Sequence, residues 1–368
     1  MAVPDANEST PDSALDDTGP TDSASDCDDS ASVDHTRCQD LSGLVAVHAG
    51  DVNRDLWDDI VYVYNSGLWC ASLNQGGELQ TPHIWLDADE PPEGAFGSLM
   101  GDVDGDSRDD VLWAPLDAWG DLSGELHLAL STGDAFAPVG EGSLLPGEST
   151  EALPCKVSRA LVADVDGDGR GELVVMDDGD GNWCAGRFNE ERFSDFVLWT
   201  EDHGAQSTTL LHGDVDGDGC EDLGAHYPPY DGAPSYVSGD WQIIGPSGST
   251  GCSPTAPADS ENDLWVKWID DYGQEAVAAF LGDVDGDRRA DAIWTDGTGE
   301  WTVGQSTGTS FDRTALFGAS GLGEGATFFV TGDFNADRHA DVAQLNQETG
   351  VWSCAAGEAG GLVPEGCL

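Results

Sequence analysis

The stretch GDVDGDGCEDLGAH, residues 213–226, places five carboxylates within ten positions and then becomes apolar. Close variants occur at five other places, so the motif is present six times, starting at Gly50, Gly101, Ala163, Gly213, Gly282 and Gly332. The first aspartates of successive copies are 51, 62, 50, 69 and 50 residues apart. Recurrence at this interval indicates one supersecondary unit repeated along the chain.

Each copy carries a carboxylate or carboxamide side chain at positions 1, 3, 5 and 9, counted from its first aspartate. We number the acidic loops 1 to 6 in chain order. Their side chains at these positions are Asp51, Asn53, Asp55 and Asp59; Asp102, Asp104, Asp106 and Asp110; Asp164, Asp166, Asp168 and Glu172; Asp214, Asp216, Asp218 and Asp222; Asp283, Asp285, Asp287 and Asp291; and Asp333, Asn335, Asp337 and Asp341.

Hard oxygen donors at this density suit Ca²⁺, which takes six to eight oxygens at about 2.3–2.6 Å. Glycine at position 4 of four copies permits a tight curl of the backbone. The sequence therefore predicts one Ca²⁺ ion in each of the six loops. We expect the weakest sites in loops 1 and 6, where Asn53 and Asn335 each replace a carboxylate.

An EF-hand loop also opens with D-x-D-x-D, but it requires a bidentate glutamate at position 12 and flanking helices. Position 12 holds Tyr62, Trp113, Val175, Ala225, Trp294 and Gln344, none of which can serve. The segments on both sides of each loop are short and apolar, such as LVAVHA before loop 1 and DIVYVY after it. This pattern is typical of strands and places each loop in the turn of a β-hairpin.

Each unit continues with a second signature, G-x-W and an apolar stretch, and in most units a fourth apolar segment follows. The second unit has GELHLA in place of G-x-W. Four strands per unit at this period indicate a β-propeller blade, and closing the ring removes the long exposed sheet edges. The fold class expected is all-β, a propeller of six four-stranded blades, with seven blades as the alternative.

These residues resemble the FG-GAP or VCBS repeat, the blade type of integrin α-chain propellers and many secreted bacterial proteins. The second unit, AFGSLMGDVDGDSRDDVLWAP, has Phe96-Gly97 where the family has FG and Ala-Pro where it has GAP. The resemblance covers about residues 42–368 and implies calcium at the hairpin between the first two strands of each blade. Integrin-like propellers usually have seven blades, whereas six motifs are present.

The composition restricts the possible partners. The 368 residues carry a formal net charge of −58 with only 13 basic side chains, which argues against nucleic acids and anionic membranes, since both require Lys and Arg. No run of 18 apolar residues suggests a membrane span. The opening MAVPDANEST lacks the basic and apolar regions of a signal peptide, so no export signal is visible.

The chain divides into two parts. Residues 1–37 contain ten acidic residues against one arginine and little to bury, so we expect a disordered acidic tail. Residues 38–368 form the repeat domain, expected to be monomeric.

The nine cysteines contain no C-x-x-C pair, which argues against zinc, and their scattering fits an oxidising, extracellular or periplasmic compartment. Pairs close in sequence are Cys354 with Cys367, Cys27 with Cys38, and Cys220 with Cys252. Buried free thiols are the alternative for several of them.

Ring closure adds a further expectation. The first blade begins with its own inner strand near Leu44 and the last ends with GLVPEGCL, so no strand is exchanged across the join. We predict that Cys354 bonds Cys367 and pins the C-terminal edge, with Cys38–Cys367 as the competing pair.

Five of the 13 tryptophans occupy the same place in the unit, namely Trp69, Trp183, Trp241, Trp301 and Trp352. This repetition predicts packing between blades and not an aromatic ligand cage. A better ligand candidate is the insertion YPPYDGAPSYVSG in the fourth unit, with Tyr227, Tyr230 and Tyr236 in a Pro/Gly-rich loop opposite the calcium hairpins. Trp119 occupies the matching connection of the second unit.

No G-x-S-x-G, H-E-x-x-H or Walker pattern is present, and the dense carboxylates are assigned to metal. We therefore expect a non-enzymatic, calcium-binding extracellular module for a glycan or protein ligand. The alternatives are a polysaccharide lyase or hydrolase on the same propeller, and a purely structural surface protein.

Overall fold

The computed structural model describes residues 35–88, 95–118, 120–123, 125–140, 144–145, 154–201, 203–205, 207, 209–227, 239–244, 252, 265–314 and 318–364. One compact unit spans His35–Leu368, so it begins three residues before the expected boundary at residue 38. Among these residues the only helix is the short 3₁₀ helix η1 (His35–Gln39), which is far too short to span a membrane; the rest of the regular structure is β.

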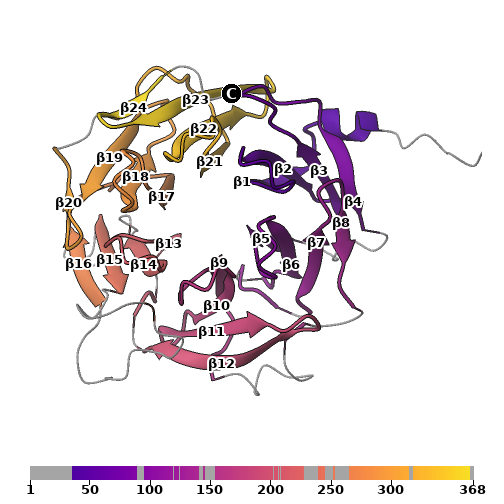
Figure 1. The fold of residues 1–368 in the computed structure, drawn as a ribbon, viewed down its shortest axis with the longest axis horizontal. Coiled ribbons are helices and arrows are strands. Elements are labelled where there is room, and N and C mark those ends of the chain that lie inside the picture. Colours follow the sequence, from indigo (N-terminus) through magenta and orange to yellow (C-terminus); the bar gives the residue numbers. More distant parts are fainter. Residues whose placement is uncertain are drawn as a thin grey trace, which may run out of the picture. The chain divides into compact units, whose positions relative to one another are not determined.

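Six antiparallel sheets of four consecutive strands form the blades of a propeller, which we number 1 to 6 in chain order. Figure 1 shows the first strand of every blade nearest the centre and the fourth strand at the periphery. The prediction of six four-stranded blades is confirmed, and the seven-bladed alternative is wrong.

The strands are as follows. Blade 1 contains β1 (Leu44–Gly50), β2 (Asp59–Tyr64), β3 (Leu68–Ser72) and β4 (His83–Asp87); blade 2, β5 (Phe96–Gly101), β6 (Asp110–Pro115), β7 (His127–Ser131) and β8 (Phe136–Pro138); blade 3, β9 (Arg159–Ala163), β10 (Glu172–Asp177), β11 (Asn182–Phe188) and β12 (Phe193–Thr200); blade 4, β13 (Thr209–Gly213), β14 (Asp222–Tyr227), β15 (Asp240–Ile244) and β16 (Trp265–Ile269); blade 5, β17 (Ala278–Gly282), β18 (Asp291–Thr295), β19 (Trp301–Ser306) and β20 (Phe311–Asp312); and blade 6, β21 (Phe328–Gly332), β22 (Asp341–Asn346), β23 (Val351–Glu358) and β24 (Gly361–Val363).

The second strand of a blade is apolar along most of its length because neighbouring blades cover both of its faces. All six residues of DIVYVY in β2 are buried, as are all six of ELVVMD in β10. Such strands do not alternate between polar and apolar residues. Each acidic loop joins the first strand of a blade to the second, as in blade 1, where Gly50 pairs with Asp59 across the turn. The predicted hairpin position of the loops is confirmed.

The hydrophobic core consists of six clusters, one between each pair of adjacent blades. The G-x-W tryptophan of one blade packs against the position-12 side chain of the next: Trp69 lies 5.7 Å from Trp113 between ring centroids, and Trp301 donates a hydrogen bond to Gln344 Oε1 at 3.0 Å. Four of the five tryptophans are at most 2% exposed. Their predicted role in inter-blade packing is confirmed.

The cluster between blades 2 and 3 lacks this tryptophan, because Leu126 takes its place. A small cavity of about 30 Å³ lies there, lined by Leu126, Leu173 and Val175 among others. The cavity is the volume that the smaller side chain leaves unfilled.

A ring of hydrogen bonds joins the blades at the acidic loops. The backbone N–H at position 8 of each loop donates to the position-1 carbonyl of the preceding blade at 2.6–3.0 Å, and loop 1 donates to loop 6, so the ring closes; the pairs are Asp58 to Asp333, Asp109 to Asp51, Gly171 to Asp102, Glu221 to Asp164, Ala290 to Asp214 and Ala340 to Asp283. A glycine precedes position 1 in five of the six loops and permits this approach in loop 1, where a Cβ at Gly50 would overlap the Asp109 carboxylate.

Blades 1 and 6 meet without strand exchange, as expected. Polar contacts join them: Asn74 donates to the Phe334 carbonyl at 2.7 Å, Gln347 to the Leu41 carbonyl at 2.7 Å, and Trp352 to the Tyr62 hydroxyl at 2.9 Å. The join is therefore an ordinary blade interface with additional side-chain hydrogen bonds.

Three disulfides are present in the described residues: Cys38–Cys70, Cys155–Cys184 and Cys220–Cys252. Cys220–Cys252 is confirmed. The Cys27–Cys38 pair and the alternative Cys38–Cys367 are wrong, because η1 packs beside β4 and brings Cys38 to Cys70 of β3. Cys354 is disulfide-bonded, and its predicted partner Cys367 lies outside the described residues. Disulfides are typical of an oxidising compartment.

Candidate metal centres and the central channel

All six acidic loops adopt one conformation, held by their own carboxylates. In loop 2, Asp102 at position 1 accepts the backbone N–H groups of positions 4, 5 and 6 at 2.7–3.2 Å. Asp104 at position 3 accepts the N–H of position 5, and Asp106 at position 5 accepts that of position 7. The side chains at positions 1, 3 and 5 thus turn the loop around one centre.

Positions 4 and 6 have positive φ in every loop. Position 4 is glycine in four loops, with Arg54 (φ 65°) and Ala336 (φ 58°) in the other two. Position 6 carries a side chain in four loops, including Leu56 (φ 75°) and Ser107 (φ 65°). Side chains in this region are strained, so the loop conformation is imposed by its hydrogen bonds and not by local preference.

The residue at position 9 begins the second strand of each blade. It is buried in loops 1, 2, 3, 5 and 6 and half-buried in loop 4. One of its oxygens accepts the position-2 N–H in every loop, at 3.0–3.3 Å. In loops 1, 2, 5 and 6 the other oxygen accepts an N–H from the third strand or just after it, from Asn74, Ser131, Ser306 and Gly357. This residue fastens the loop to its blade.

The predicted ligands converge. Carboxylate oxygens of positions 1, 3 and 9 lie within 4.8 Å of one another in loops 2, 3 and 5, as do those of positions 1, 3 and 5 in loop 4. Loops 1 and 6 have the same fold with asparagine at position 3. Three carboxylate oxygens around one centre form a donor set that fits a hard divalent cation, while position 5 in loops 2, 3 and 5 and position 9 in loop 4 lie outside the converging group.

Burial raises the pKa of the position-9 carboxyls. The values are about 8 for Asp59, Asp110, Glu172, Asp222 and Asp291 and about 7 for Asp341, with neighbouring loop carboxylates adding to the effect of burial. A buried carboxyl among other carboxyls favours its neutral form when no cation is near. A bound cation would favour the ionised form and release these protons.

Asp218 also lies close to Cys220 and Cys252. The two sulfurs form a disulfide, so this group is not a thiolate metal site. The disulfide instead ties loop 4 to the segment after β15.

Only part of the predicted ligand loop falls within the described residues. Trp119, Tyr230 and Tyr236 lie outside them. Tyr227 ends β14, is 7% exposed and belongs to the core cluster between blades 3 and 4, so its expected place in an exposed loop is wrong. The strand extends one residue further than the Pro-rich insertion suggested, and Tyr227 is therefore core.

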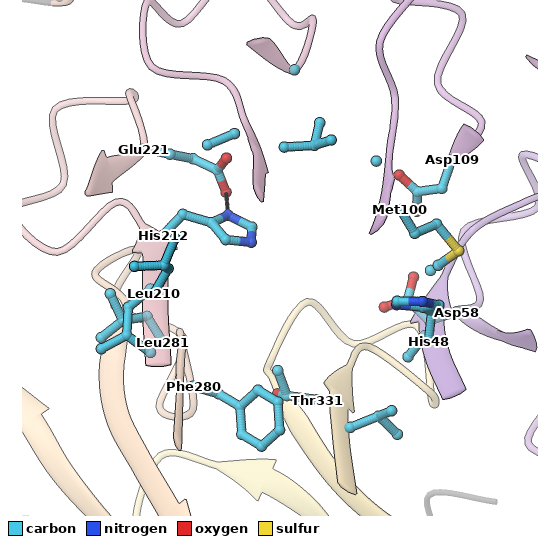
Figure 2. Close-up of a pocket in the computed structure, with 18 of the residues that line it drawn as sticks. His48, Asp58, Met100, Asp109, Leu210, His212, Glu221, Phe280, Leu281 and Thr331 are labelled. Atoms are coloured by element: carbon cyan, nitrogen blue, oxygen red, sulfur yellow. Dashed lines mark hydrogen bonds and ion pairs between the residues drawn. The ribbon is translucent and has the colours of Figure 1, made fainter. Parts of the chain in front are cut away.

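A channel of about 690 Å³ runs between the first strands of the six blades. Figure 2 shows His212 and Glu221 on one wall and His48, Asp58 and Asp109 across from them. His212 Nδ1 lies 3.2 Å from Glu221 Oε1, and His48 Nε2 lies 2.8 Å from Ser98 Oγ.

The charges of the channel differ between its walls. Burial opposes the charge on each member of the His212–Glu221 pair, but their attraction outweighs it, raising the pKa of His212 and lowering that of Glu221. Burial raises the pKa of Asp58 to about 7 and that of Asp109 well above its usual range. Among the described residues, no basic side chain forms an ion pair with Asp58 or Asp109.

Sequence reasoning missed this channel, although position 8 carried a signal. That position is acidic only in loops 1, 2 and 4, as Asp58, Asp109 and Glu221. Two of these side chains accept the position-1 N–H of the preceding blade: Asp58 from Asp333 at 2.7 Å, and Glu221 from Asp164 at 2.8 Å. The position-8 carboxylates were not among the predicted ligands, and the structure places them in the lining of the channel.

No protein-family model matches the sequence, and no curated protein matches it. Among solved structures, an Agrocybe aegerita lectin that recognises non-reducing terminal N-acetylglucosamine is 16% identical, with a TM-score of 0.55 over 87% of this chain and 80% of the lectin. AofleA from Arthrobotrys oligospora is 11% identical, with a TM-score of 0.48 over 88% of this chain and 86% of its own. An exo-β-1,3-galactanase from Phanerochaete chrysosporium is 11% identical, with a TM-score of 0.47 over 85% of this chain and 67% of its own. The lectin comparison shows a shared fold.

Proposed function

We propose that the six acidic loops bind Ca²⁺ and that the calcium-loaded propeller is an extracellular binding module for a glycan or protein. The observation that carries the calcium proposal is the convergence of carboxylate oxygens within 4.8 Å in loops 2, 3, 4 and 5. The same backbone conformation in loops 1 and 6 extends it to all six. This donor set and loop pattern also support the relationship to FG-GAP and VCBS repeats.

The residues that would hold the ion are those at positions 1, 3, 5 and 9. Ca²⁺ would neutralise carboxylates that otherwise repel one another, and it binds them together only in the folded chain, so it stabilises the fold by linkage. Because the loops also carry the ring of hydrogen bonds between blades, calcium would stabilise the whole propeller and not one hairpin.

The calcium experiment is thermal unfolding of the full chain with added Ca²⁺, with excess EDTA after extensive dialysis, and with Mg²⁺. We expect a large fall in melting temperature in EDTA, restored by Ca²⁺, and site dissociation constants on the order of 10⁻⁵–10⁻³ M, as in extracellular modules. Asp104→Ala removes a position-3 ligand, and Glu300→Ala removes an exposed carboxylate outside the loops as its matched control. Identical melting curves in Ca²⁺ and EDTA would sink the calcium proposal.

The binding proposal rests on the rigid six-bladed frame, which can present long connections on the face opposite the loops. The lectin that shares this fold recognises a sugar, which is an analogy at the level of the fold alone. We expect retention on a glycan or matrix-protein array in Ca²⁺ and its loss in EDTA, without release of products. Soluble products from a polysaccharide would favour the lyase or hydrolase alternative instead.

A further inference from the structure

Loop 3 differs from the other five loops in two residues that face each other. Its position 9 is Glu172, where the others have aspartate. In the strand register, Leu173 pairs with Gly186, so Arg187 of β11 lies opposite Glu172. The corresponding described residues of blades 1, 2, 5 and 6 are uncharged: Leu73, Leu130, Gln305 and Ala356.

The Arg187 guanidinium lies among the ligand carboxylates of loop 3. Its Nε is 3.2 Å from Glu172 Oε1, its Nη2 forms an ion pair with Asp166 Oδ2, and the same nitrogen is 3.9 Å from Asp168 Oδ2. The Asp166 and Glu172 side chains are only 4% exposed. Positions 3, 5 and 9 of this loop therefore share one fixed positive charge.

The arginines of loops 2 and 5 each contact one ligand carboxylate, at position 5. Arg108 and Arg289, at position 7 of loops 2 and 5, pair with the position-5 carboxylates Asp106 and Asp287, which are 30% and 26% exposed. In the described residues, neither arginine forms an ion pair with the carboxylates at positions 1, 3 and 9, which converge in loops 2 and 5. Only in loop 3 of the described residues does a guanidinium contact members of the converging set.

Glu172 also lacks one backbone contact that its counterparts make. In loops 1, 2, 5 and 6 the second oxygen of the position-9 carboxylate accepts a backbone N–H. In loop 3 the corresponding oxygen, Glu172 Oε1, pairs with Arg187 Nε instead. The longer glutamate and the arginine thus replace a backbone contact with a charge-assisted one.

We propose that Arg187 is the built-in counter-ion of loop 3, and that this loop is the weakest calcium site of the six. The proposal rests on calcium binding by the other loops. A cation entering loop 3 must displace a guanidinium from two buried carboxylates, whereas in loops 2 and 5 the arginine pairs with the partly exposed position-5 carboxylate alone. This order replaces the one expected from Asn53 and Asn335, because asparagine still offers Ca²⁺ an amide oxygen, whereas the Arg187 guanidinium both adds a positive charge and occupies two of the ligand carboxylates.

The test compares the full-length wild type with Arg187→Gln, and with Arg192→Gln as a matched control, since Arg192 lies in the same blade on the β11–β12 turn. Ca²⁺ binding is followed by equilibrium dialysis, and the occupied loops are identified by anomalous scattering from calcium-soaked crystals. At a Ca²⁺ concentration that just fills the other five loops, we expect loop 3 to be partly occupied in the wild type and in Arg192→Gln and fully occupied in Arg187→Gln, with loop 3 tightened about tenfold or more.

A second readout does not depend on stoichiometry. In EDTA, Arg187→Gln should melt below the wild type, because Asp166 and Glu172 have lost the guanidinium that pairs with them, and it should gain more from added Ca²⁺. Equal occupancy of loop 3 in wild type and Arg187→Gln would overturn this inference and leave calcium binding intact. Absence of bound Ca²⁺ from every variant would instead overturn the proposed function.

Discussion

At the scale of single residues, the loop conformation requires left-handed backbone at positions 4 and 6, and the chain does not always provide glycine there. Leu56 at position 6 of loop 1 has a φ of 75° and a side chain that is 72% exposed. It therefore suffers the steric cost of this conformation with little burial in return. Gly169 occupies the same position in loop 3 with a φ of 84°, and the space where a Cβ would lie is open.

We expect Leu56→Gly to stabilise the protein by about 0.5–1 kcal/mol, since relief of the strain exceeds the added entropy of the unfolded chain. The reciprocal change Gly169→Leu should destabilise it by a similar amount. Denaturant unfolding in saturating Ca²⁺ measures both. A loss of stability in Leu56→Gly would mean that its side chain packs against something that matters more than the backbone.

The position-9 carboxylate has a structural role that is separate from metal binding. Both oxygens of Asp291 accept backbone N–H groups, from Val284 at 3.1 Å and Ser306 at 2.8 Å, and the residue is fully buried. A carboxamide has one accepting oxygen only, so one N–H would face the amide nitrogen.

Asp291→Asn should therefore cost about 1–3 kcal/mol even in EDTA. Asp285→Asn, at position 3 of the same loop, is the control, because loops 1 and 6 carry asparagine there. It should change the apo stability little. Equal effects of the two changes on unfolding in EDTA would contradict a separate structural role.

At the scale of the element, each blade is stabilised by its neighbours, because the clusters that bury its second and third strands contain residues of two blades. An isolated four-stranded antiparallel sheet would expose both faces of those strands. The G-x-W tryptophan is the largest side chain of most of these interfaces, and in blade 2 its replacement by Leu126 leaves a cavity.

Trp301→Ala should destabilise the propeller by about 3–5 kcal/mol, through lost burial and the cavity left behind. It also leaves the Gln344 amide oxygen without its indole donor. Trp301→Phe should cost less, as it keeps most of the volume. Urea unfolding followed by far-UV circular dichroism measures both, and a loss below 1 kcal/mol for alanine would show that the interface relaxes to fill the space.

At the scale of the whole molecule, backbone hydrogen bonds join the six acidic loops into one ring, in a chain whose total charge is −58. Without a cation, the folded state raises the pKa of the position-9 carboxyls to about 7–8. Unfolded carboxyls titrate near 4. Between these values the folded chain holds more protons than the unfolded chain, so its stability falls as the pH rises.

In EDTA we therefore expect the melting temperature to fall as the pH rises from 6.5 to 8, and to fall less in saturating Ca²⁺, which keeps the carboxylates ionised. Burial lowers the pKa values of His48 and His226 to about 4. These two histidines therefore increase the stability of the folded chain with rising pH only below about 6.5. They do not change the melting temperature between pH 6.5 and 8. Calorimetry at a series of pH values measures the slope. A melting temperature in EDTA that rises over this window would refute the assignment.

The sequence by itself determined the number of blades, the four strands of each, the hairpin position of every acidic loop and the packing role of the five tryptophans. These are local or periodic properties: ligand spacing within one loop and apolar runs that recur with the blade. The Cys220–Cys252 disulfide was among the predicted pairs, but sequence separation alone does not identify it, since the same 32 residues separate Cys38 from Cys70.

Only the tertiary structure decided which residues meet across blades and across the ring. It brought Cys38 to Cys70, buried Tyr227, and turned the position-8 carboxylates into the channel instead of the metal loops. It also placed Arg187 in loop 3, although 15 residues separate it from Glu172. Such contacts depend on strand register and blade rotation, which fix where a side chain points but leave no periodic trace in the chain.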